Sequence, residues 1–209
     1  MPQARATRAD GDGEPGRRMS KGRFEAFTDA VIAVVITIMV LEMKAPHEPT
    51  FAALCALWPV LLSYILSFVY VGIYWNNHHH LMHAVEHVNG RVMWANLHLL
   101  FWVSLFPFTT AWMSENHFAP LPTALYGCVL LLAALAWPLL VRELIACNGP
   151  DCALARIVGS DRKAWLSIVF YAAAIPLAFV AAWISCVLYV AVAAMWFVPD
   201  RRIERVEAA

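Results

Sequence analysis

Six long apolar stretches constrain this chain more than any other feature of its sequence. They occupy residues 24–43, 51–75, 92–113, 120–141, 164–180 and 182–198. A helix needs about 20 residues to cross the ~30 Å hydrocarbon core of a bilayer, so each stretch qualifies or nearly qualifies as a span. The whole chain is 61% hydrophobic and 14% charged, whereas soluble domains average about 25% charged residues. The sequence therefore predicts an all-α membrane protein.

The last two stretches belong to one apolar block that is too long for a single span. Pro176 lies inside this block and is followed by small residues. A proline followed by small residues predicts a tight turn near Phe179–Trp183, with one helix on each side. The chain is therefore expected to have six transmembrane helices.

The positive residues predict how these helices are oriented. With six spans and both termini inside, the inner segments are 1–23, 76–91, 142–163 and 199–209. Every Lys and Arg of the chain except Lys44 then lies inside. Because Lys and Arg mark the cytoplasmic side of a membrane protein, both termini are expected to be cytoplasmic.

The domain organisation is simple. Residues 1–22 are polar and basic and predict a disordered cytoplasmic tail, residues 23–198 a six-helix membrane domain, and residues 199–209 a short cytoplasmic tail. The loops offer little polar surface for a substrate, so an enzyme is not expected. Zero formal net charge argues against a nucleic-acid partner. Five scattered cysteines predict no disulfide framework and are interpreted as small buried hydrophobes.

Between Ala30 and Leu41 the first stretch is apolar except for Thr37. At 100° per residue, Ala30, Val34, Thr37 and Leu41 share one helical face, with Ile38 beside them. Periodicity alone favours an ordinary buried helix in which Thr37 bonds to the carbonyl four residues earlier.

Asp29 places a carboxylate about one third of the way into this stretch. An ionisable group inside a span costs about 2.5–3.5 kcal/mol or more unless it is paired or hydrated. Asp29 therefore either joins a polar network, with Arg23 and the polar start of the third stretch as partners, or caps the true start of the helix. The sequence leaves both interpretations open.

Five histidines follow the second stretch: His78, His79, His80, His83 and His87. His79, His83 and His87 have the i, i+4, i+8 spacing of one helical face, and imidazoles so spaced can bind zinc or copper. However, no cysteine accompanies them and Glu86 is the only nearby carboxylate. A structural role is favoured, and no metal site is predicted.

The start of the first stretch carries a recognisable motif. Arg23, Phe27, Thr28 and Asp29 fit the pattern RxxxFSD, with Thr28 in place of the usual serine. The chain thereby resembles the lysosomal and endosomal potassium channel family named transmembrane protein 175. The blocks TIMVLE (37–42), YWNNHHHLMH (74–83) and LFPFTTAW (105–112) extend the resemblance, which covers roughly residues 24–198.

The resemblance implies a specific architecture. Six-helix bacterial members of the family assemble as homotetramers, and the first helix of each subunit lines a central pore. The family's apolar constriction corresponds here to Val34, Ile38 and Leu41, and Thr37 to the pore-facing hydroxyl. The family more often has Ile or Leu where this chain has Val34.

The same resemblance implies a structural role for the motif. Arg23, Phe27, Thr28 and Asp29 are expected to attach the first helix to its neighbours, with Trp75, Asn77 and His79 as partners. Glu42, at the outer end of this helix, is either part of a cation-attracting ring or a solvated interfacial carboxylate.

The expected function is a potassium-permeable cation channel in the plasma membrane. Its partners would be copies of itself, the lipid bilayer and monovalent cations, with permeating K⁺ in place of any cofactor. One alternative is a proton- or metal-coupled carrier that uses Asp29 and the His78–His87 cluster. Another is a membrane enzyme or assembly factor without conduction.

Overall fold

The computed structural model describes residues 20–158 and 162–197, and within them the regular secondary structure is entirely helical. The helices are α1 (Lys21–Leu41), α2 (Phe51–Ala56), α3 (Trp58–His83), α4 (Gly90–Ser104), α5 (Phe106–Glu115), α6 (Pro120–Asn148), α7 (Ala153–Val158) and α8 (Arg162–Phe197). The all-α class is confirmed. The tail predicted at 199–209 and nearly all of the tail predicted at 1–22 lie outside the described residues.

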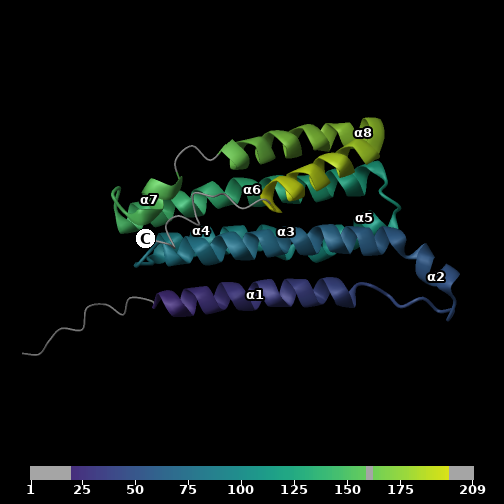
Figure 1. The fold of residues 1–209 in the computed structure, drawn as a ribbon, viewed down its shortest axis with the longest axis horizontal. Helices are drawn as coiled ribbons and strands as arrows, with labels where there is room; N and C mark the ends of the chain where they lie inside the picture. Colours follow the sequence, from purple (N-terminus) through teal and green to yellow (C-terminus); the bar gives the residue numbers. More distant parts are fainter. Residues whose placement is uncertain (1–19, 159–161, 198–209) are drawn as a thin grey trace, which may run out of the picture.

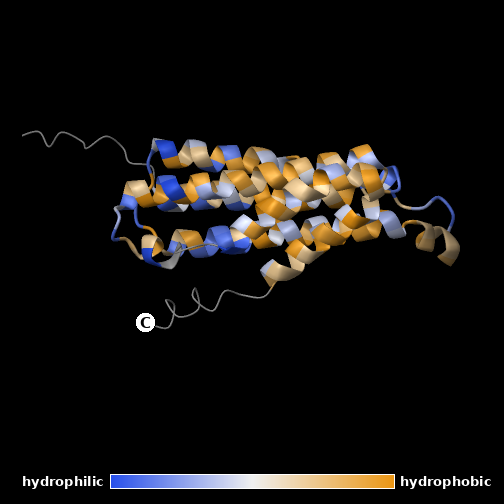
Figure 2. Ribbon diagram, turned by 90° about the horizontal axis from the view of Figure 1, so that it is seen from above, coloured by the Kyte–Doolittle hydropathy of each residue, from blue (hydrophilic) through white to orange (hydrophobic). Residues whose placement is uncertain are grey.

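Five helical segments of the described residues are long and apolar enough to cross a membrane. They are Lys21–Leu41, Trp58–His83, Gly90–Glu115, Pro120–Asn148 and Arg162–Phe197. Figure 2 shows hydrophobic residues along most of their length and hydrophilic residues concentrated toward the ends. The chain is thus a multi-pass membrane protein.

The last of these segments, α8, reverses direction in its middle. Ala181 has a non-helical backbone, with φ −158° and ψ 99°. On either side, the Ser185 hydroxyl donates to the Ala174 carbonyl at 2.6 Å and the Trp196 indole donates to Ser167 Oγ at 2.9 Å. The two halves of α8 therefore run antiparallel, side by side (Figure 1). The predicted turn near Phe179–Trp183 is confirmed.

Prolines break two of the predicted stretches into separate helices. The stretch 51–75 becomes α2 and the start of α3, and 92–113 becomes most of α4 and α5. Pro59 and Pro107 each stand in the first turn of the following helix. A proline has no N–H to donate and its ring clashes with the carbonyl four residues earlier, so it is best accommodated where a helix begins.

Two helices also extend further than hydropathy predicts. α3 continues to His83 and α6 to Asn148, whereas the sequence placed residues 76–91 and 142–163 in inner segments. Hydropathy reports where a helix leaves the hydrocarbon, and the helix itself can continue into water. Four of the five clustered histidines therefore lie on α3, but His87 does not.

The cysteines differ from expectation in their exposure. All five are free, Cys55 is exposed and the other four are half-buried. The interpretation of all five as buried is wrong, because the outer surface of a membrane-spanning bundle is itself apolar and accommodates a small hydrophobic side chain.

The helices pack around a core rich in tyrosine. α6 packs against α4, α5 and α8, α3 against α5 and α8, and α1 against α3, α4 and α5. Tyr70 Oη donates to the Tyr189 carbonyl at 2.6 Å, and Tyr189 Oη donates to the Thr123 carbonyl at 3.0 Å. Each hydroxyl finds a carbonyl inside the bundle, as a group buried away from water must.

Gly127 makes room for one of these tyrosines. A Cβ atom at this position would overlap Tyr189 Oη. We expect Gly127→Ala to lower the free energy of unfolding by about 1–3 kcal/mol, because Tyr189 must move and its bond to Thr123 weakens. Thermal or denaturant unfolding of the purified protein in detergent measures the change.

Gly72→Ala on α3 is the matched control, because a Cβ there meets nothing within 4 Å. Its stability should stay close to that of the unchanged protein. Equal stability of the two variants would show that Gly127 is not needed for the packing of Tyr189.

The helices alternate in direction, so the start of α1, the end of α3, the start of α4, the end of α6 and the start of α8 lie at one end of the bundle (Figure 1). The described Lys and Arg residues of this end are Lys21, Arg23, Arg91, Arg142, Arg156, Arg162 and Lys163. Lys44 lies beyond the opposite end of α1. Its Nζ atom forms an ion pair with Oε1 of Glu115, the last residue of α5, at 3.5 Å.

Candidate functional site

α1 has two apolar faces, and only one of them packs against other described helices of the same chain. Phe24, Thr28, Ile32, Val35 and Met39 are buried against the neighbouring helices. Their spacing of three and four residues makes them one continuous stripe.

The other face of α1 is apolar and uncovered. Val34 is 54% exposed, Ile38 39% and Leu41 78%. A helix that is apolar all round belongs in a membrane or in a protein interior. The exposed face is therefore suited to contact with lipid or with another protein surface.

A buried hydrogen bond sets which face of α1 is turned inward. Thr28 Oγ1 accepts from Asn96 Nδ2 of α4 at 2.8 Å and donates to the Phe24 carbonyl at 3.2 Å. Thr28 and Asn96 are each 1% exposed. Rotation of α1 would separate these two groups where no water can replace either partner, so the bond stabilises the observed rotation.

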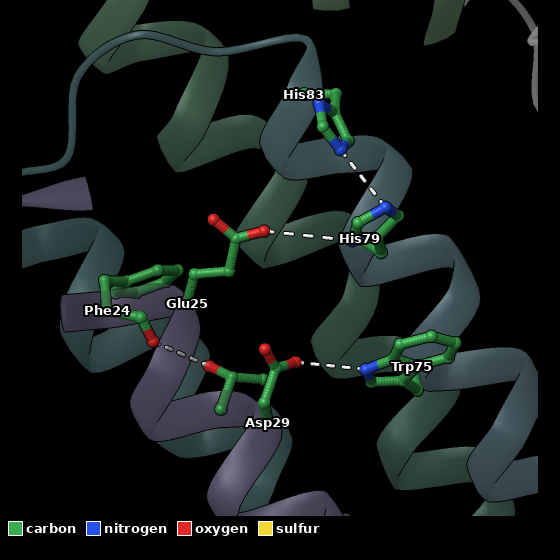
Figure 3. Close-up of polar contacts among 7 residues, drawn as sticks. Phe24, Glu25, Asp29, Trp75, His79 and His83 are labelled. Atoms are coloured by element: carbon green, nitrogen blue, oxygen red, sulfur yellow. Dashed lines mark hydrogen bonds and ion pairs between the residues drawn. The ribbon is translucent and has the colours of Figure 1, made fainter. Parts of the chain in front are cut away.

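Asp29 attaches α1 to α3 on the adjacent face. Its Oδ1 accepts from Trp75 Nε1 at 3.0 Å (Figure 3). One turn earlier, Glu25 Oε1 lies 3.8 Å from His79 Nδ1. The rings of Trp75 and His79 stack at 5.8 Å. Asp29 therefore lies inside α1 and joins a polar network; it does not cap the start of the helix, which is at Lys21.

The structure separates the remaining members of the predicted network. Arg23 and Phe27 are exposed on α1, and Asn77 lines a small cavity with Tyr74 and Trp137. Within the described part of the chain, neither Arg23 nor Asn77 bonds to Asp29.

Two contributors to the network are absent from the sequence-based set. Asn96 holds Thr28, and Glu25 faces His79. The signal for Asn96 is that it is the only side-chain amide in the stretch 92–113. Nothing in the sequence distinguishes Glu25 from the other charged residues near the start of α1, because its partner depends on how α1 and α3 are docked.

A groove of about 660 Å³ runs between α1 and α5. Its α1 wall consists of apolar residues: Phe27, Ala30, Val31, Val34, Val35 and Ile38. Pro107, Phe108, Ala111 and Trp112 of α5 form the facing wall, and Glu42 and Glu115 also line the groove. Two of the three predicted constriction residues, Val34 and Ile38, therefore share this surface.

Thr37 and Leu41 lie on the exposed side of α1, outside the groove lining. Thr37 Oγ1 donates to the Val34 carbonyl at 2.9 Å. The bond reaches the carbonyl three residues back, where four was expected. Because the hydroxyl's proton is used within the helix, its oxygen lone pairs are what it can present to a ligand.

The histidine cluster is also divided. His78 is buried and stacks on Phe24 at 5.8 Å, whereas His79 Nε2 lies 3.1 Å from His83 Nε2. The described residues contain no group of three or more His, Cys, Asp or Glu side chains that could hold a metal ion.

Comparisons with known proteins agree on one family. The profile of the family described as endosomal/lysosomal potassium channel TMEM175 matches residues 23–107. The chain is 48% identical over 187 residues to a potassium channel of Chryseobacterium sp. (strain P1-3), across 90% of this chain and 97% of that one. It is 36% identical over 124 residues to a potassium channel of Streptomyces collinus, across 56% of this chain and 60% of that one.

A solved structure shares the fold. It is the crystal structure of a lysosomal potassium-selective channel TMEM175 homolog from Chamaesiphon minutus. The two structures superpose with a TM-score of 0.74 at 26% sequence identity, over 84% of this chain and 95% of that one.

Proposed function

This chain belongs to the bacterial branch of the TMEM175 family, and from that premise we propose that it is a potassium channel built from four copies around a central pore. In this assembly the first helix of each copy lines the pore. The observation that carries the proposal is the uncovered apolar face of α1, whose rotation is set by buried hydrogen bonds on its other side.

The pore wall consists of Val34, Thr37, Ile38 and Leu41. Four symmetry-related copies of Val34, Ile38 and Leu41 form a hydrophobic constriction that closes the path by excluding water. The four Thr37 oxygens replace part of the hydration shell of a passing cation. Their exposed positions on α1 support this role.

The motif around Asp29 is structural in this proposal. Arg23, Phe27, Thr28 and Asp29 belong to the segment of α1 that attaches it to α3 and α4, through Trp75 and Asn96. Hydrogen bonds between membrane helices contribute on the order of 1 kcal/mol each, which is enough to favour one rotation of a helix over another.

Six spans cross the membrane when the two antiparallel halves of α8 are counted separately. We place both termini in the cytoplasm and the protein in the plasma membrane. The gathering of described Lys and Arg residues at one end of the bundle supports this orientation. K⁺ is then the permeating ion, and the partners are copies of the same chain, the bilayer and monovalent cations.

Potassium flux from liposomes tests the proposal. Purified protein reconstituted into K⁺-loaded vesicles should release K⁺ down its gradient, with a current that is linear in voltage and needs no second substrate. Flux that saturates and requires a proton or metal gradient would instead indicate the coupled carrier. Protein that folds but passes no K⁺ under any voltage would overturn the channel.

Oligomeric state is measured independently. Light scattering or native mass spectrometry in detergent should report four copies of the 23.3 kDa chain. A stable monomer would contradict the proposed pore, because one copy of α1 cannot surround a central axis.

A further inference from the structure

Two histidines at the end of α3 point the same ring nitrogen at each other. His79 and His83 are one helical turn apart, and their Nε2 atoms are 3.1 Å apart (Figure 3). Two imidazole nitrogens bound to one tetrahedral Zn²⁺, each at about 2.0–2.1 Å, stand about 3.3 Å apart. This contact is a hydrogen bond, so one of the two Nε2 atoms carries the proton between them. The spacing is also close to that of a chelate, which forms when a metal ion displaces that proton.

His79 has a neighbour on an edge and on a face of its ring. Glu25 Oε1 lies 3.8 Å from His79 Nδ1, on the far edge of the ring from Nε2. In metal sites a carboxylate on this edge of an imidazole accepts a hydrogen bond from Nδ1–H and leaves the Nε2 lone pair for the metal. Glu25 would take that role by moving closer to Nδ1 when the metal binds.

Trp75 stacks on the face of the His79 ring at 5.8 Å, with 21° between the planes. Trp75 is itself fixed, because its Nε1 donates to Asp29 at 3.0 Å. The His79 ring is thus positioned by contacts with α1 and α3 that do not involve His83. A ligand positioned in advance loses less conformational freedom on binding.

The site is open to solvent and lies where a cation is favoured. The His79 side chain is 43% exposed, and His83 is exposed as the last residue of α3. The carboxyl end of a helix carries a partial negative charge that attracts cations.

We propose that His79 and His83 form a two-ligand site for a divalent transition metal of the Zn²⁺ type, with Glu25 as the residue that orients His79. Water completes the coordination, since the described residues offer no third protein ligand. Imidazole nitrogen favours Zn²⁺ and its transition-metal neighbours over Mg²⁺, Ca²⁺ or K⁺. Both ligands lie on α3, and Glu25 relates the site to α1, the helix on which the pore proposal depends.

His87 is not part of this site, although its sequence spacing suggests it. α3 ends at His83, and the backbone N–H groups of Glu86 and His87 donate to Asn148 Oδ1 at 3.0 and 2.9 Å. The loop is thereby attached to the end of α6 and does not continue the helical face.

Calorimetric titration with ZnCl₂ tests the proposal on the full chain, purified without a polyhistidine tag and stripped of metal. We expect one Zn²⁺ per chain, and loss of that stoichiometric binding in His83→Ala. Glu25→Gln should weaken binding about tenfold while both ligands remain. His47→Ala is the matched control, because His47 is exposed in the loop after α1, at the opposite end of the bundle.

His87→Ala tests whether His87 is a ligand, as the i, i+4, i+8 spacing suggests and the structure does not. This variant should bind Zn²⁺ with the same affinity as the unchanged protein. Zn²⁺ should also raise the melting temperature of the unchanged protein and of His47→Ala, but not of His83→Ala. The proposal fails if the unchanged chain takes up no stoichiometric Zn²⁺ or if His83→Ala keeps full affinity for Zn²⁺. It also fails if His87→Ala loses as much Zn²⁺ affinity as His83→Ala does. Zn²⁺ binding is measured without ion flux, so failure of the channel proposal would not be mistaken for failure of this one.

Discussion

Ile38→Asn is expected to raise the potassium flux of reconstituted protein about tenfold, which corresponds to lowering the barrier to permeation by about 1.4 kcal/mol. Ile38 lies on the exposed face of α1 and lines the groove toward α5. In the proposed pore, four amides at this level would admit water to a constriction that apolar side chains keep dry. The flux is measured in K⁺-loaded liposomes at equal protein content.

Val40→Asn is the matched control for this variant. Val40 is on the same helix and is 44% exposed, close to the 39% of Ile38. At 100° per residue, however, it points about 160° away from Ile38. It should therefore raise the flux far less than Ile38→Asn does.

Melting temperatures of both variants show whether the fold is retained. An Ile38→Asn protein that is folded and passes no more K⁺ than Val40→Asn would contradict the placement of the pore. If Ile38 were an ordinary packing residue, the variant would only lose stability.

Thr28→Val is expected to lower the free energy of unfolding by about 1–3 kcal/mol. The substitution keeps the shape of the side chain but removes the oxygen that Asn96 Nδ2 contacts at 2.8 Å. The amide is 1% exposed and is left with no acceptor at that position. Because the bond also sets the rotation of α1, the potassium flux should fall in the same variant.

The double variant Thr28→Val/Asn96→Leu makes this prediction specific. It removes both members of this bond, so neither is left buried without the other, and most of the lost stability should return. The two substitutions are thus expected to be strongly non-additive, which a double-mutant cycle of unfolding free energies measures. Additive losses would show that the two side chains act independently.

Thr109→Val is the control for the loss of a buried threonine hydroxyl. Thr109 is also 1% exposed, but its Oγ1 donates only to carbonyls of its own helix region, Leu105 and Phe106. Thr109→Val should lower the free energy of unfolding by less than Thr28→Val does, because no group on another helix loses a hydrogen-bond partner.

Some features of the fold follow directly from the sequence. The apolar stretches identify the membrane-crossing segments, and the small residues after Pro176 locate the reversal at Ala181. These predictions succeed because the cost of placing polar groups in hydrocarbon depends on composition along the chain, and not on which helices are neighbours. The position of Val34, Ile38 and Leu41 on one side of α1 follows equally from helical periodicity.

Helix ends were predicted less well. α3 continues through the histidines to His83, and α6 continues to Asn148. Hydropathy cannot mark these ends, because a helix that has left the membrane needs only hydrogen-bonded turns and suitable caps. Pro59 and Pro107 predict kinks within their stretches, whereas each stands in the first turn of a new helix. A proline in an apolar stretch either kinks a helix or starts a new one, and both outcomes have the same composition.

The sequence by itself determined that this chain crosses a membrane several times and which residues share each face of its first helix, because both properties depend on local composition and on the pitch of a helix. Only the tertiary structure decided that Thr28 meets Asn96, that Asp29 meets Trp75 and that Glu25 faces His79. Those pairs depend on the relative rotation and height of separate helices. Rotation and height are set by the packing of all the helices together, which no single segment of the sequence encodes.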